Sequence, residues 1–377
     1  MSRNRIVRLV LQALVLLVVA VGIAHSSRKA ALQLAAQQTV LAESAAEREA
    51  TASQTVDSNE RARLLSEAAR LRAAVDRFWY ASPALLLLSG LCYAIGLLPA
   101  NWYWRQCLLA MDQRAPLLAT SWAYFYGGLG KYFPGKAMVI ILRLNALSAY
   151  NFKKMATAIT IFMETLTMMA VGGAVASLCL IALNIDWKLT ALAVSLLVCM
   201  FLPTLPPALR LIIAKLQRGV SAETLREWTS RIHAGLILKG WIAMLATWLM
   251  WGLSLLCILQ GLPIAEHLAT NWTQLILSAL GACTLAVVLG FVSLLPGGAG
   301  VREVVLSTIL APIVGPTAAL CAAIWLRVIW LATELAVVAV IALIRAVAPR
   351  SSSNDTASTH TASSNTATNQ TANASRS

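Results

Sequence analysis

Residues 285–312, LAVVLGFVSLLPGGAGVREVVLSTILAP, contain the interruption that decides the fold. The stretch is apolar enough to enter a membrane, but Pro296 and Gly297 stand near its centre. Proline lacks a backbone donor and glycine loosens the chain, so we expect the helix to break there. A broken backbone at membrane depth is tolerated only where protein or a watery cavity covers it. The sequence therefore predicts a broken or re-entrant helical segment.

A second apolar stretch interrupted by Pro-Gly occurs earlier in the chain. Residues 117–150 are also apolar, and their segment GKYFPGKAMVIILR at 130–143 is interrupted at Pro134 and Gly135. Interrupted helices at corresponding places in two halves of a chain are typical of a transport site. The alternative is that each Pro-Gly pair is an ordinary loop between two spans, with lysines marking the cytoplasmic face.

The composition places most of the chain in a membrane. Hydrophobic residues make up 59% and charged residues 12% of the chain, whereas soluble domains carry about a quarter charged residues. The long continuous runs of Leu, Ala and Val favour helices over the short alternating strands of a barrel. We therefore predict an all-α, polytopic membrane protein. The predicted spans lie near residues 6–24, 79–104, 155–183, 188–213, 240–261, 274–292 and 316–345.

The net charge of +14 points to the membrane surface rather than to nucleic acid. The cations cluster at the ends of apolar segments, as the positive-inside rule and attraction to anionic lipids require. By this rule residues 214–239, Lys153 and Lys154 are cytoplasmic, whereas the span count and Arg345 disagree about the side of the C-terminus. The seven cysteines lie singly in apolar segments, without CxxC pairs, so we predict no disulfide framework, metal site or cofactor.

The chain is expected to have four parts. Residues 1–25 are predicted to form an N-terminal transmembrane anchor, with a cleaved signal sequence as the alternative. Residues 26–78 are polar and lack Gly and Pro, which favours an extramembrane helical insert. Residues 79–348 make up the transmembrane domain. Residues 349–377 are a Ser/Thr/Asn-rich tail that cannot repay the entropy of ordering and is expected to be disordered.

Apolar residues in the second half of the insert alternate by four and three, as in the seam between two packed helices. This spacing predicts a helical hairpin outside the membrane. A helical spacer without a partner is the alternative. The seam residues are Leu64, Ala68, Leu71, Val75 and Phe78.

The residues around both breaks suit an anion. Free N–H groups at the start of a half-helix carry positive potential. Lys131 and Lys136 flank the first break, and Arg302 lies in the first turn after the second. The glycine run that includes Gly298 and Gly300 supports a break there rather than a plain loop. A phosphate group is the predicted ligand.

Several charged residues fall at membrane depth, where each costs at least roughly 2.5 kcal/mol on insertion scales. They could pair with one another and hold the helices together without any part in turnover. Alternatively, the arginines bind a lipid phosphate, while Glu164 or Glu303 pairs with them in the empty site or carries a proton. Arg327 and Glu334 are seven residues apart and share one helical face. The full set is Arg143, Glu164, Arg302, Glu303, Arg327 and Glu334.

With these residues in view, the chain resembles the membrane region of lysylphosphatidylglycerol synthases and their stand-alone, flippase-like relatives. The resemblance covers roughly residues 79–345 and rests on GKYFPGKAMVIILR, Glu164, SLLPGGAGVREVVL and Arg327. It implies a bacterial cytoplasmic-membrane protein that translocates, or helps to modify, phospholipids or isoprenoid-linked glycans. The synthases add a soluble domain that transfers lysine from its tRNA; a polar tail follows residue 350 here, so that activity is not expected.

Three functions are compatible with these observations. The leading hypothesis is a translocase for an anionic phospholipid or a polyprenyl-phosphate-linked substrate. The second is a membrane glycosyltransferase, which the scattered histidines and the absence of a nucleophile motif disfavour. The third is a scaffold subunit that docks a separate enzyme through residues 214–239. The candidate substrate-binding residues are Lys131, Pro134, Gly135, Lys136, Arg143, Glu164, Pro296, Gly297, Gly298, Gly300, Arg302, Glu303, Arg327 and Glu334.

Overall fold

The structure is a computed structural model, and it describes residues between 35 and 347. Within the described residues the chain forms helices and no strands, so the predicted all-α class is confirmed. Two compact units are distinguished, Met1–Val338 and Ala339–Ser377. The gaps in the described range are residues 37, 41, 77–79, 134–136, 151, 184–186, 206, 209–210, 212–222, 224–229, 263–270, 294 and 299.

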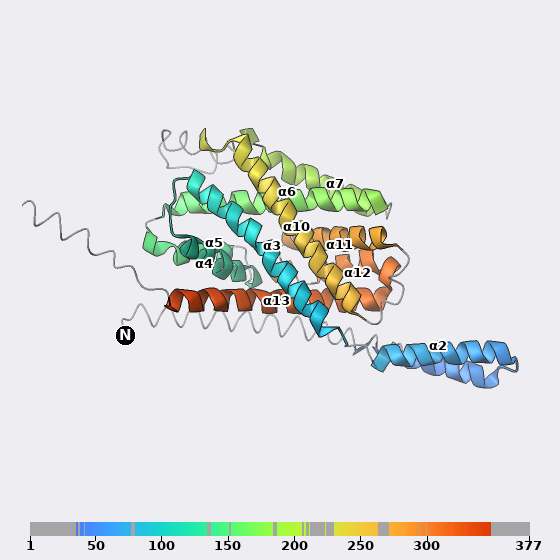
Figure 1. Ribbon diagram of the computed structural model, residues 1–377. Coiled ribbons are helices and arrows are strands. Elements are labelled where there is room, and N and C mark those ends of the chain that lie inside the picture. The colour runs from blue at the N-terminus through green and yellow to red at the C-terminus, as the bar shows by residue number, and fades with distance from the viewer. Residues whose placement is uncertain are drawn as a thin grey trace, which may run out of the picture. The chain divides into compact units, whose positions relative to one another are not determined.

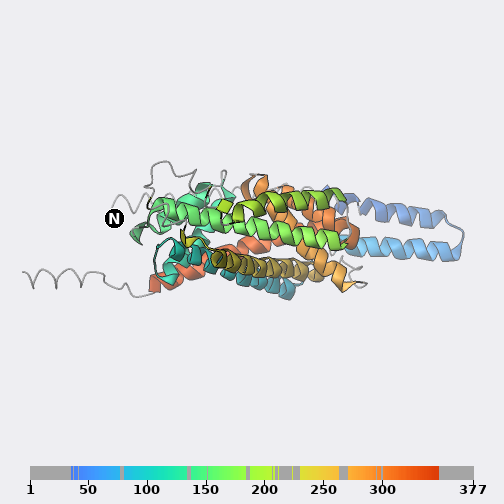
Figure 2. The same ribbon diagram turned by 90° about the horizontal axis from the view of Figure 1, so that it is seen from above.

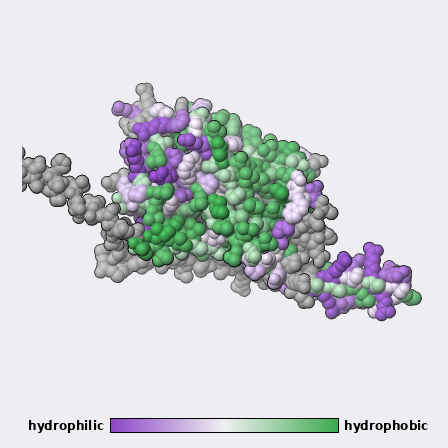
Figure 3. Space-filling view, viewed as in Figure 1, coloured by the Kyte–Doolittle hydropathy of each residue, from purple (hydrophilic) through white to green (hydrophobic). Residues whose placement is uncertain are grey.

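Five helices in the described part of the chain are long and apolar enough to cross a membrane. They agree with the predicted spans that begin near residues 79, 155, 240, 274 and 316. A hydrophobic surface covers α3 and α10 (Figure 3), as expected for helices that face lipid. The chain is therefore a multi-pass membrane protein. The five helices are α3 (Pro83–Ala110), α6 (Lys154–Leu183), α10 (Ala234–Gly261), α11 (Trp272–Val292) and α13 (Pro316–Val347), which is apolar from Ala318.

One predicted span differs from the structure. Within the described residues, the run at 188–213 begins as α7 (Trp187–Phe201), which packs against α6 and is followed directly by the short helix η3 (Leu202–Thr204). Pro203 lies within η3, and its missing N–H and fixed φ explain why the α-helix stops there although the apolar sequence continues. The span predicted at 6–24 and the tail at 349–377 lie outside the described residues.

The helical bundle has two distinguishable ends, which Figures 1 and 2 show from two sides. At one end the backbone N–H of Lys153, before α6, donates to Gln113 Oε1 in the α3–α4 connection, 2.8 Å away. The exposed cations Arg114, Lys154 and Lys239 are at or near this end, which we call the basic end. At the opposite end the N–H of Ser82, before α3, donates to the carbonyl of Gly261 at the close of α10, 2.9 Å away.

The first broken segment is a hairpin that enters from the basic end. It consists of α4 (Leu117–Gly128), η1 (Leu129–Tyr132) and α5 (Ala137–Ala146), followed by η2 (Ser148–Tyr150). α4 and α5 lie side by side (Figure 1). A Cβ atom on Gly130 would lie 2.6 Å from the backbone nitrogen of Val139, so this glycine permits the close approach of the two arms. We call this element the first re-entrant hairpin.

The second broken segment enters from the opposite end. α11 leads inward, the short helix η4 (Pro296–Gly298) forms the tip, and α12 (Val301–Val314) returns beside α11 (Figure 1). The backbone of Gly297 has φ +59° and ψ 10°, so the helix breaks at Pro296–Gly297 as predicted. We call this element the second re-entrant hairpin, because α12 turns back beside α11 toward the end from which α11 enters.

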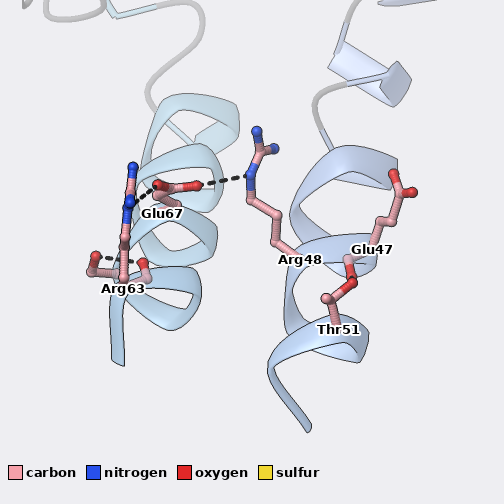
Figure 4. Close-up of polar contacts among 6 residues, drawn as sticks. Glu47, Arg48, Thr51, Arg63 and Glu67 are labelled. Atoms are coloured by element: carbon pink, nitrogen blue, oxygen red, sulfur yellow. Dashed lines mark hydrogen bonds and ion pairs between the residues drawn. The ribbon is translucent and has the colours of Figure 1, made fainter. Parts of the chain in front are cut away.

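Upstream of the bundle, helical residues 42–54 pack against α2 (Ser58–Asp76) in a charged hairpin (Figure 2). Arg48 Nε and Arg63 Nε contact opposite oxygens of Glu67 at 3.2 and 3.3 Å (Figure 4), so Glu67 joins the two helices. Glu49 pairs with Arg72 across the same interface. The predicted seam is occupied by buried Ala68 and half-buried Leu64, Leu71 and Val75, whereas Phe78 lies outside the described residues.

Small residues allow the close packing of the charged hairpin. Ala45, Ala52 and Ala68 are at most 1% exposed. Ala52→Leu is expected to destabilise the hairpin by about 1–3 kcal/mol, because a larger side chain has to separate the helices. The loss of stability should appear as faster cleavage at Arg61 and Arg63 in limited digestion with trypsin.

Ala46→Leu is the matched control, since Ala46 is exposed on the same helix. Its cleavage rate is expected to equal that of the wild type. Equal rates for Ala52→Leu and Ala46→Leu would contradict the packing role of Ala52.

Candidate functional site

The tips of the two re-entrant hairpins meet inside the bundle. η1 of the first contacts η4 of the second. A Cβ atom on Gly297 would lie 3.4 Å from Cδ1 of Tyr132, which is ordinary van der Waals contact. Two interrupted segments that are far apart in sequence therefore form one structure between the two ends of the bundle.

A cavity of about 260 Å³ lies beside the meeting tips. Lys131, Thr165 and Arg302 contribute its polar side chains, and η4 contributes backbone. The remaining wall is apolar and includes Phe162 and Leu295, which are 41% and 47% exposed at the surface of the bundle. The cavity lining thus combines the cationic side chains of Lys131 and Arg302 with apolar residues that reach the surface of the bundle. Its lining is Lys131, Phe133, Val139, Ile140, Ile161, Phe162, Thr165, Gly290, Phe291, Leu295, Gly297, Gly298 and Arg302.

Arg302 is held between the backbones of Gly290 and Gly298. A Cβ on Gly290 would lie 2.9 Å from Arg302 Nε, and one on Gly298 would lie 2.8 Å from the Cα of Gly290. Gly298 also has φ +68°, which L side chains rarely adopt. Glycine at both positions leaves room for the Arg302 side chain, which a Cβ at either position would displace.

The charge of Arg302 is not compensated by a carboxylate among the described residues. Its Nε is buried without a hydrogen-bond partner. Arg302 also borders a small pocket of about 20 Å³ together with Glu303 and Arg327, enough for one water molecule. Arg302 makes no hydrogen bond or ion pair with the described residues and lines the cavity, so its guanidinium is available to an anion that enters there.

Lys131, also on the cavity wall, is already paired. Its Nζ contacts Glu334 Oε1 on α13, and the hydroxyl of Tyr93 on α3 donates to the same oxygen. Tyr93 stacks on Trp330 with ring centroids 4.3 Å apart, which fixes its position. The side chain of Glu334 is 8% exposed. This group ties the first tip to two long helices.

Arg327 and Glu303 form a second pair at the second tip. Arg327 Nε lies 2.8 Å from Glu303 Oε1, and Arg327 Nη2 donates to the carbonyl of Gly297 at 2.9 Å. Glu303 Oε2 accepts the N–H of Gly300 at 2.8 Å, which caps the start of α12. Arg327 therefore stabilises the broken backbone of η4 and does not line the larger cavity.

The third pair, Arg143 and Glu164, lies apart from the cavity. Arg143 Nη1 and Glu164 Oε2 are 2.9 Å apart, and both side chains are 5% exposed. The guanidinium lies 4.6 Å from the ring centroid of Trp104 and 4.5 Å from that of Tyr124. The hydroxyl of Tyr124 also donates to Glu164 at 3.4 Å. This cage fastens the first re-entrant hairpin to α6.

The predicted site residues thus fall into three groups. Lys131, Gly297, Gly298 and Arg302 line the cavity, and Gly300, Glu303, Arg327 and Glu334 support the tips. Arg143 and Glu164 form a separate buried pair. Pro296 belongs to η4, whereas Pro134, Gly135 and Lys136 lie outside the described residues.

Sequence reasoning missed two members of this site. Tyr93 is fully buried and holds Glu334, and Thr165 lines the cavity one residue after Glu164. A tyrosine within an apolar span needs a partner for its hydroxyl when buried, so Tyr93 could have been singled out. Thr165 has no such signal, because a threonine can hydrogen-bond within its own helix.

Within the described residues, no group of three or more His, Cys, Asp or Glu side chains is placed to hold a metal ion. The resemblance to the lysylphosphatidylglycerol synthase membrane region stays a prediction that rests on the motifs alone. Comparisons with protein-family models and with curated proteins find no match to the chain.

Proposed function

We propose that the protein binds the phosphate group of a lipid in the cavity at the meeting tips and moves that lipid between the two leaflets. The observation that carries this proposal is the position of Arg302. Arg302 lies on the wall of a 260 Å³ cavity and makes no hydrogen bond or ion pair with the described residues. A phosphate oxygen that enters the cavity could accept a charge-assisted hydrogen bond from the guanidinium.

The apolar rim supports a lipid as the source of the phosphate. Phe162 and Leu295 are exposed at the edge of the cavity, on the surface that faces hydrocarbon in a membrane. A headgroup bound to Arg302 could leave its acyl chains beside these residues. The bundle need not enclose the chains, which agrees with the modest volume of the cavity.

The two hairpins enter the bundle from opposite ends, which supports translocation of the lipid rather than binding alone. Each tip is attached to one end of the bundle, so small relative shifts would open the cavity toward one side or the other, as in other transporters built from broken helices. By the positive-inside rule the basic end would be cytoplasmic. A bacterial cytoplasmic membrane is the proposed location.

Arg302→Gln is expected to reduce lipid translocation at least about tenfold, because a hydrogen bond to a charged group contributes roughly 1.5–3 kcal/mol. The measurement uses purified protein in vesicles that contain fluorescent phosphatidylglycerol. A membrane-impermeant reductant then reports how fast label leaves the inner leaflet.

Lys239→Gln is the matched control. It removes the same charge from an exposed position in α10, outside the cavity, and is expected to leave the rate unchanged. Equal rates for wild type, Arg302→Gln and protein-free vesicles would reject the proposed function.

The scaffold alternative depends on residues 214–239. Most of residues 214–229 lie outside the described part of the chain. Docking of a separate enzyme therefore stays a prediction.

A further inference from the structure

We infer that the hydroxyl of Thr165 donates a hydrogen bond to the same phosphate group that Arg302 binds. The bound lipid would then link α6 to the second re-entrant hairpin. This role rests on the proposed function and adds a second binding residue to it. It follows from the position of Thr165 on α6 and from the state of its hydroxyl.

Thr165 lies on the face of α6 that forms part of the cavity wall. Ile161 and Phe162, four and three residues earlier, line the same cavity, as expected for positions on one helical face. Among the cavity-lining residues of α6, Thr165 is the polar one. The preceding residue, Glu164, is turned about 100° around the helix and pairs with Arg143 instead. Thr165 therefore places a hydroxyl on an otherwise apolar part of the wall.

The hydroxyl of Thr165 is available, unlike those of the other threonines in α6. Thr157, Thr160 and Thr167 each donate to a backbone carbonyl three or four residues earlier in the chain. This is a common way for a threonine in a helix to satisfy its donor. Thr165 makes no hydrogen bond with the described residues. Its donor is therefore free for a group that enters the cavity.

Thr165 and Arg302 reach the cavity from two different elements, α6 and α12. A phosphate group offers more than one charged oxygen, so it can accept hydrogen bonds from a hydroxyl and a guanidinium at the same time. The pair formed by Arg143 and Glu164 already fastens α6 to the first re-entrant hairpin. A phosphate bound by both side chains would therefore join the second re-entrant hairpin to α6 and the first.

Thr165→Val is the direct test, because valine keeps the branched shape of threonine and removes its hydroxyl. Dissociation constants for phosphatidylglycerol are measured by native mass spectrometry of the full chain in detergent. The variant is expected to bind the lipid about fivefold more weakly than wild type, which corresponds to about 1 kcal/mol. Thr165→Ser keeps the hydroxyl and should bind with nearly the wild-type affinity.

Thr157→Val is the matched control, since it removes a hydroxyl from the same helix outside the cavity lining. Its affinity for the lipid should equal that of the wild type. Without lipid, Thr165→Val should unfold at the same concentration of sodium dodecyl sulfate as the wild type. A loss of affinity in this variant would then reflect the missing hydroxyl rather than a loss of stability.

The double variant Thr165→Val with Arg302→Gln tests whether the two side chains bind one phosphate group. Residues that bind the same group are coupled, so the double variant should weaken binding by less than the product of the two single effects. Water-soluble glycerophosphoglycerol is the probe for a free phosphodiester. It should bind more weakly than the lipid, because it lacks the acyl chains that Phe162 and Leu295 would contact.

Wild-type affinity in Thr165→Val, or an equal loss in Thr165→Ser, would overturn the role of the hydroxyl. Arg302→Gln would still weaken lipid binding in that case, and the proposed function would stand. Equal binding by wild type and Arg302→Gln would remove the proposed function itself. Single effects that multiply in the double variant would show that the two side chains bind separate groups. Glycerophosphoglycerol binding as tight as that of the lipid would exclude the lipid as the source of the phosphate.

Discussion

Arg143→Leu is expected to lower the free energy of unfolding by about 3–5 kcal/mol, since it leaves the buried carboxylate of Glu164 without its counter-charge. Both side chains of this pair are 5% exposed, so neither solvent nor salt can take the place of the lost partner. The variant also removes the cation that contacts the rings of both Trp104 and Tyr124. The first re-entrant hairpin should therefore detach from α6 at lower denaturant concentration.

The buried thiols of Cys107 and Cys283 can report this unfolding. A thiol-reactive dye added during a titration with sodium dodecyl sulfate labels them only after the bundle opens. A Cys199→Ser background removes a thiol that is exposed in the folded protein. The unfolding midpoints of wild type and variant then give the change in stability.

The double variant Arg143→Leu with Glu164→Leu is the informative control. Buried ion pairs can often be replaced by apolar residues with little loss, so the double variant should recover most of the stability. Arg48→Leu is the comparison at the protein surface, because its partner Glu67 is 38% exposed. This variant should lower the free energy of unfolding by less than about 1 kcal/mol. A double variant as unstable as the single one would contradict the role assigned to the pair.

Gly130→Ala is expected to cost about 1–3 kcal/mol and to weaken lipid binding, because the added methyl group overpacks the first re-entrant hairpin. Its Cβ would lie 2.6 Å from the nitrogen of Val139 and 2.8 Å from the carbonyl carbon of Met138. Both are backbone atoms, so no side-chain rotation can relieve the overlap. The arms have to separate, and Lys131 moves with them.

Gly128→Ala provides a control two residues away. No atom lies within 4 Å of the Cβ position at Gly128, and its backbone is helical. Alanine favours helix over glycine by up to about 1 kcal/mol, so this variant should be neutral or slightly stabilising. The same dye titration, together with the lipid translocation assay in vesicles, compares the two variants. A Gly128→Ala variant as damaged as Gly130→Ala would contradict the close-approach argument.

Much of the helical architecture could be predicted from the sequence, because long apolar runs have few alternatives in a membrane. The effect of a proline on a helix is harder to predict from the sequence. Pro99 lies inside α3 without ending it, whereas Pro203 lies where α7 stops. Neighbouring helices can satisfy the backbone groups that a proline frees, and a single sequence does not show where they do. The break at Pro296 could be predicted because flexible glycines follow it.

The candidate site was predictable in its residue types but not in its pairings. Charges at membrane depth identified Arg302 and Glu334 as candidates, and the first Pro-Gly break identified Lys131. Lys131 and Glu334 are 203 positions apart in sequence. Nothing in one sequence specifies that these two should meet. Because Lys131 pairs with Glu334, the cation that lacks a carboxylate partner among the described residues is Arg302.

That charge has an electrical consequence. A guanidinium held between the two faces of a membrane lies within the transmembrane field, where full transfer of one elementary charge is worth about 2.3 kcal/mol per 100 mV. Any shift of the tips in the empty protein would carry the charge of Arg302 with it. Once a bound phosphate group neutralises Arg302, the same shift carries none of this charge. Voltage would then act on the unloaded state alone and draw it toward the negative side of the membrane.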